Sequence, residues 1–83
     1  MEKTVLVILV SRRDDKIIEL QKILTQYGSI IKTRLGLHDS SEGSDSGLII
    51  LELVGGDKEK KEALQKALQK HESIKSKLVS LSI

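Results

Sequence analysis

The sequence predicts an α+β protein of the ferredoxin-like type, a βαββαβ sandwich whose two helices lie on one face of a four-stranded antiparallel sheet. Four apolar, strand-like stretches and two amphipathic stretches follow one another in that order. Two of the apolar stretches are apolar on both faces, while the other two alternate with polar residues. Right-handed crossovers then put the doubly apolar strands in the centre and give the strand order 4-1-3-2. The length of 83 residues fits a single domain over residues 1–83.

The first half of the pattern begins with a central strand and a helix. Thr4–Val10 is aliphatic on both alternating faces, as in a strand that is covered on both sides. Arg12–Tyr27 carries apolar residues at helical spacing. Ser11 and Asp14 resemble a capping box at its start, and Gly28 is typical of a helix end. We therefore expect a helix that packs one stripe on the sheet.

The next stretch, Ser29–Leu37, has the alternation of an edge strand. Its two faces are predicted to hold Ile31, Thr33, Leu35 and Leu37 on one side, and Ile30, Lys32, Arg34 and Gly36 on the other. The face with charged residues is expected to be wet, and its cations would discourage pairing with other chains. A polar, serine-rich hairpin loop over His38–Ser46 follows it.

The second half repeats the plan of central strand, helix and edge strand. Gly47–Val54 is apolar on both faces except at Glu52, which predicts the second central strand. Asp57 is placed to cap a helix over Lys58–Glu72. The expected stripe of this helix is Leu64, Ala67, Leu68 and His71, and Lys58–Lys61 is interpreted as part of its solvated face. Ser73–Ile83 alternates as the other edge strand.

Composition excludes several classes of function. There is no cysteine for a disulfide or a thiolate metal site, and the net charge is only +2. Tyr27 is the sole aromatic residue, which speaks against a nucleic-acid stacking platform in this domain alone. No stretch is long enough to span a membrane or to form a secretory signal, so we expect a cytoplasmic protein. We expect no enzyme, no cofactor and no metal site.

The central strands carry the main physical consequence. Two helices can cover only one face of the sheet, so aliphatic residues of both central strands remain on the other face. A contiguous apolar patch of this kind usually marks an interface. The simplest partner is another copy of the chain, and we expect a homodimer or homotetramer that forms through sheet surfaces.

Candidate binding residues are few, and each has a structural alternative. Ser11 and Arg12 lie at the first strand-to-helix turn, where free N–H groups can hold an anion or where Ser11 only caps the helix. Gly36 next to Arg34 indicates either a local bulge or the close approach of a ligand or another backbone. His38 with Asp39 could contribute to a metal site only if an oligomer doubled them, so we interpret them as a solvated pair.

Two segments resemble a known family. Arg34–Leu37 (RLGL), the polar loop and Gly47–Leu53 (GLIILEL) are similar to small proteins known as iron-only hydrogenase system regulators, as is the short Met-Glu-Lys leader before an apolar strand. That family is ACT-like and related in fold to the C-terminal domain of the nickel-responsive regulator. The resemblance implies an oligomeric regulatory domain that senses a small ligand. The regulator's several metal-binding histidines and its cysteine are missing here, where only His38 stands near such a position, and a ribbon-helix-helix segment for DNA is missing too.

The resemblance also implies a ligand site. ACT domains commonly bind amino acids at a subunit interface, beside the first strand-to-helix turn and the glycine after the first helix. Ser11, Arg12 and Gly28 are at comparable positions in this chain. The predicted ligand-binding set is Ser11, Arg12, Gly28, Arg34 and Gly36. The predicted function is a regulatory module that binds a small ligand or partner; the alternatives are a DNA-associated transcriptional regulator that acts through its oligomer, and a small enzyme.

Overall fold

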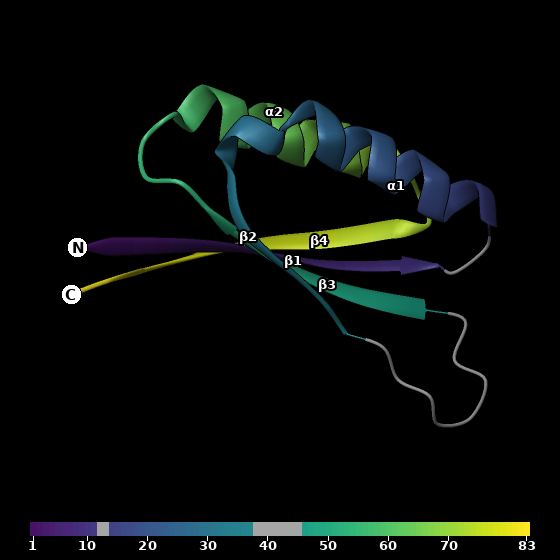
Figure 1. The fold of residues 1–83 in the computed structure, drawn as a ribbon, viewed down its shortest axis with the longest axis horizontal. Coiled ribbons are helices and arrows are strands. Elements are labelled where there is room, and N and C mark those ends of the chain that lie inside the picture. The colour runs from purple at the N-terminus through teal and green to yellow at the C-terminus, as the bar shows by residue number, and fades with distance from the viewer. Residues whose placement is uncertain (12–13, 38–45) are drawn as a thin grey trace.

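The chain forms a two-layer α+β sandwich, seen in the computed structural model, which describes residues 1–11, 14–37 and 46–83. Its elements are β1 (Glu2–Ser11), α1 (Asp14–Gln26), the 3-10 helix η1 (Gly28–Ile30), β2 (Ile31–Leu37), β3 (Ser46–Leu53), α2 (Lys58–Gln69) and β4 (Ile74–Ser82). The sheet order is β2-β3-β1-β4 with every pair antiparallel, which confirms the predicted order and the ferredoxin-like fold. Both helices lie on one face of the sheet (Figure 1).

The hydrophobic core lies between the helices and the sheet face that they cover. Leu6 pairs with Leu51, and Ile8 pairs with Ile49, so the two central strands present matched aliphatic side chains to the helices. The buried residues of these strands are Leu6, Ile8, Val10, Ile49, Leu51 and Leu53, and those of the helices are Leu20, Ile23, Leu24, Leu64 and Leu68. Burial of these side chains is the main stabilising term of so small a domain.

The edge strand β2 differs from its prediction in both register and orientation. A bulge lies between Ile31, which pairs with Leu53, and Thr33, which pairs with the next residue of β3, Glu52. The extra residue breaks the period of two, so Ile31 packs against the core while Thr33 does not share its face. Beyond the bulge, Leu35 is on the face away from the helices and is half-exposed. The predicted grouping of Ile31 with Thr33 was therefore wrong.

The first helix ends by a mechanism other than a left-handed glycine cap. Helix α1 stops at Gln26, and the chain enters η1 at Gly28, whose φ is outside the left-handed region. This single tight turn places Ile30 in the core, where it is fully buried. The predicted helix end was correct to within one residue, while its start, at residues 12–13, lies outside the described residues.

Helix α2 begins as predicted but buries a residue that was expected to be solvated. Asp57 accepts a hydrogen bond from the Lys60 N–H (3.4 Å) and adopts a left-handed φ of 47°. The helix ends at Gln69, so half-buried His71 follows it rather than ending its stripe. Lys61, at the helical spacing of Leu64, is only 9% exposed. The interpretation of Lys61 as part of the solvated face was wrong.

Candidate functional site

The face of the sheet that points away from the helices, called the open face below, is aliphatic across all four strands. Its aliphatic residues are Val5, Val7, Leu9, Leu35, Leu37, Leu48, Ile50, Val79 and Leu81. Five of them, from β1, β2 and β4, have exposed fractions between 37% and 71% (Leu9, Leu35, Leu37, Val79 and Leu81). The others are partly buried by their neighbours within the sheet. An aliphatic patch on this scale is typical of an interaction surface.

The register of the strands makes this patch continuous. Val7 of β1 lies between Ile50 of β3 and Lys77 of β4, and Ile50 in turn pairs with Leu35 of β2. Directly paired side chains on one face are close enough to pack together. The centre of the open face is therefore aliphatic, and exposed lysines such as Lys77 begin at the β4 side. An apolar centre with a polar rim is the usual anatomy of a protein interface.

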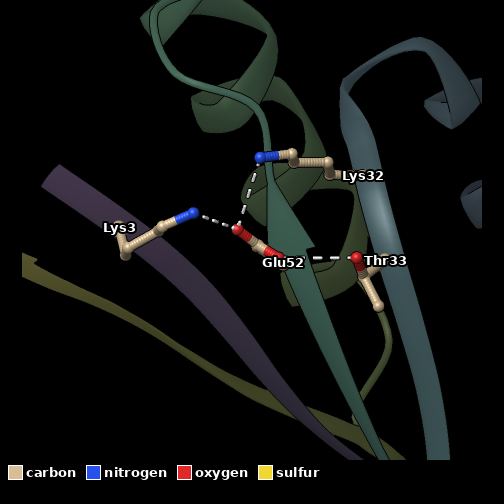
Figure 2. A network of polar contacts seen from close by, with 4 residues as sticks. All are labelled: Lys3, Lys32, Thr33 and Glu52. Carbon is tan, nitrogen blue, oxygen red and sulfur yellow. Dashed lines mark hydrogen bonds and ion pairs between the residues drawn. The ribbon is translucent and has the colours of Figure 1, made fainter.

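A polar cluster closes one end of the patch (Figure 2). The Lys3 ammonium lies 3.1 Å from Oε2 of Glu52, and the Lys32 ammonium lies 3.8 Å from the same oxygen. Thr33 donates its hydroxyl to Oε1 of Glu52 at 3.4 Å. The hydrogen bond and charge of Lys3, aided by Lys32, hold the pKa of the Glu52 carboxyl below its ordinary value. Glu52, the one charged residue of the second central strand, is thus paired with lysines from β1 and β2.

The predicted ligand-binding residues do not gather in one place. Ser11 ends β1, where its N–H donates to the Ser73 carbonyl (3.1 Å), and Gly28 follows the other end of α1. A helix of 13 residues is about 20 Å long, so these two positions are far apart. Arg12 lies outside the described residues, as do the predicted pair His38 and Asp39. The set as a whole stays a prediction.

Arg34 and Gly36 are the two predicted residues that the structure brings together. They lie on the helix side of β2 and line a hollow of about 290 Å³ with residues of α1. The Arg34 guanidinium donates to Oε1 of Gln21 on α1 at 2.6 Å. No described atom lies within 4 Å of the place where a Cβ of Gly36 would stand. Arg34 is thus held by α1, while Gly36 leaves open space at the edge of the sheet.

Sequence reasoning missed a second hollow, of about 440 Å³, between the start of α2 and the ends of β1 and β4. It includes Lys61, the lysine whose burial the sequence interpretation did not predict. The available signal was its spacing, since Lys61, Leu64 and Leu68 lie on one helical stripe.

In the described part of the chain, no three histidine or acidic side chains are grouped so that they could hold a metal ion. None of the helices described here is long and apolar enough to cross a membrane.

Comparison with known proteins identifies the fold. No family model matches the chain, and no curated protein matches it. Among solved structures, the uncharacterized protein TM1266 from Thermotoga maritima superposes with a TM-score of 0.85 at 22% identity, over 99% of this chain and 100% of that one. CPII from Thiomonas intermedia K12, a nitrogen regulatory PII-like protein, superposes in its apo form with a TM-score of 0.68 at 14% identity, over 100% and 92% of the two chains.

A second structure of CPII contains ligands. It is bound to ADP, AMP and bicarbonate, and it superposes with a TM-score of 0.62 at 11% identity, over 99% of this chain and 97% of that one. These likenesses extend over whole chains, so the ferredoxin-like fold accounts for essentially all of the present chain. At such identities they establish the fold, and function has to be argued from the surface of this chain.

Proposed function

We propose that the chain is a cytoplasmic, ACT-like regulatory domain that acts by assembly with copies of itself through the open face, and that a small ligand or partner biases this assembly. The proposal assigns it no catalytic step. The observation that carries the proposal is the aliphatic open face, which the domain leaves half-exposed in a single copy.

The energetics favour a second copy as the cover of this face. Each aliphatic side chain left in water forgoes roughly 1.5–3 kcal/mol relative to full burial. β1 has 10 residues, so at about 3.3 Å per residue and about 4.8 Å between strands the face measures roughly 400–500 Å² in flat projection. This flat area is below the roughly 600–1,000 Å² per partner that stable interfaces bury, so we expect an assembly that depends on protein concentration. A two-fold axis would place the patch of one copy against the same patch of the other.

Two lines of similarity support a regulatory role. Structural neighbours over the whole chain include a nitrogen regulatory PII-like protein, one of whose structures contains ADP, AMP and bicarbonate. The sequence resembles iron-only hydrogenase system regulators, which supports assigning the regulation to such a system. A ligand that binds the assembled form better than the single copy would shift the equilibrium between them.

Light scattering of the purified chain tests the assembly directly. Over roughly 1–100 µM, the range expected of a small interface, the mass should be two or four times the 9.2 kDa of one chain. Leu35→Lys places a charge in the open face, 52% exposed in one copy, and should yield single chains because a buried, unpaired ammonium is costly.

Ile18→Lys is the matched control, because Ile18 is 55% exposed on α1, away from the open face. This variant should keep the mass of the unchanged protein. A single-chain mass at every concentration, or equal dissociation by both variants, would overturn the proposal.

A further inference from the structure

The hollow beside α2 combines a small-molecule volume with a lysine whose side-chain stem is buried. It lies where α2 begins, at the same end of the sheet as the two chain termini (Figure 1), and measures about 440 Å³. Sites for small molecules typically range from about 300 to 1,000 Å³. The hollow is on the helix-covered side and includes no aliphatic residue of the open face. It is therefore a separate feature, complete within one chain.

Lys61 gives this hollow its chemistry. The side chain is only 9% exposed and lines the hollow, and its ammonium makes no hydrogen bond or ion pair with the residues that the structure describes. By contrast, Lys3 and Lys60 each have a carboxylate partner although both are well exposed. The stem of Lys61 is buried while its ammonium keeps contact with water, and an anion placed in the hollow would meet a cation that pairs with no described carboxylate.

The sheet floor of the hollow adds hydroxyl groups. Oγ1 of Thr4 and Oγ of Ser80 lie 3.1 Å apart in one hydrogen bond, and both residues line the hollow. A hydroxyl carries one proton and two lone pairs, so one O–H of this pair remains available to donate. Thr4 is buried, and it lies on the same face of β1 as the core residues Leu6, Ile8 and Val10. The floor of the hollow therefore offers polar groups next to the aliphatic part of the covered face.

The other charges limit what the hollow can hold. Lys58 adds a second cation, but Glu2 and Glu62 also line the hollow and balance the two lysines. Two carboxylates disfavour a ligand with several negative charges and can accept hydrogen bonds from ligand hydroxyls. The matching ligand has one anionic group and donor groups next to it.

We propose that this hollow binds a small polyol carrying one phosphate or carboxylate group, with the anion at Lys61 and the hydroxyls facing Thr4, Ser80 and Glu62. The competing explanation is that Lys61 is only a buried stem whose ammonium is satisfied by water, as long cationic side chains often are.

Titration followed by backbone amide NMR separates these explanations. The probes are glycerol 3-phosphate, glycerate and uncharged glycerol, which share hydroxyl groups and differ in the anion. Either anion should shift the amides of residues 58–65 and of Thr4 and Ser80, whereas glycerol should not. The anion that binds with the higher affinity shows whether the hollow prefers a phosphate or a carboxylate. A concentration of about 10 mM reveals even millimolar affinity. If neither anion shifts these amides at that concentration, the proposal is overturned.

The variants test Lys61 itself. Lys61→Met keeps most of the stem and removes the charge, so it should weaken binding about tenfold or more, as expected for a charged hydrogen bond. Lys66→Met, on the exposed side of the same helix, should bind like the unchanged chain. Equal binding by Lys61→Met and the unchanged chain would refute the assignment.

Two further measurements keep the test decisive. If Lys61→Met does not fold, Ser80→Leu fills the hollow without altering the lysine; loss of binding in this variant supports the site, and unchanged binding overturns it. Because the site lies within one chain, Leu35→Lys should also bind the anion, so failure of the assembly proposal would not mimic failure of this one.

Discussion

The two faces of the sheet are built from the same central strands and have similar aliphatic content, but only one is covered. Leu51 and Ile50 are neighbours in β3, and Leu51 is fully buried beneath the helices while Ile50 keeps part of its surface in water. Both amphipathic helices lie on the same face of the sheet, so the other face has no cover within the chain. An apolar surface therefore shows that it must be buried, but it does not show what buries it. Here the helices bury one face, which forms the core, and the open face remains as the candidate interface.

The largest expected effect is the difference between neighbouring truncations in β3. Leu51→Ala should lower the free energy of unfolding by about 2–5 kcal/mol, because it leaves a closed cavity. Ile50→Ala should cost clearly less, because water can reach its site. Urea unfolding of both variants in the Leu35→Lys background isolates the single chain. Equal losses would remove the distinction between the faces.

A second test concerns the margin of the covered face at β2. Gly36 points to the helix side, but a Cβ there would meet no described atom within 4 Å and its φ is not left-handed. Gly36→Ala should therefore raise the free energy of unfolding by about 0.5–1 kcal/mol. On folding, glycine loses more backbone conformational entropy than alanine does. Thermal and urea unfolding measure this.

Gly56→Ala is the control for that substitution, because φ at Gly56 is 78° and alanine is strained there. It should destabilise the chain. A destabilising Gly36→Ala would indicate that something packs against this edge and that the cover extends further than the helices.

The smallest effect concerns the polar end of the open face. Lys3, with help from Lys32, lowers the pKa of Glu52 in the folded state. The ionised Glu52 carboxylate therefore contributes to stability above its ordinary pKa of 4.5, and this contribution is lost as the pH falls through the lower pKa of the folded state. Glu52→Gln should reduce this acid-dependent loss, and Lys3→Met should reduce it similarly. Urea midpoints measured from neutral to acid pH check the prediction, and salt should weaken the effect because the pair is partly exposed.

An unchanged acid profile in both variants would contradict the assigned role of the cluster. It would also leave the aliphatic centre as the only feature that distinguishes the open face from an ordinary solvated sheet surface.

Much of the fold could be predicted because it follows from local periodicity. The doubly apolar stretches around Leu6 and Leu51 had to become central strands, and strand order then followed from crossover handedness. The orientation of β2 could not be predicted, because a bulge after Ile31 depends on how the turn at Gly28–Ile30 places Ile30 in the core. The site was less predictable still. Arg34 and Gly36 do share a hollow, but Ser11 and Gly28 lie at opposite ends of α1.

The amino-acid sequence by itself determined which strands are central, that two helices cover one face, and that aliphatic residues remain on the other. These properties depend on side-chain periods of 2 and 3.6 residues, which are local. Only the tertiary structure decided that Leu35 faces outward, that β1 and β2 each place a lysine beside Glu52, and that Lys61 is buried beside a polar hollow. Each of these depends on contacts between residues distant in the chain, which the packing of helices on the sheet determines.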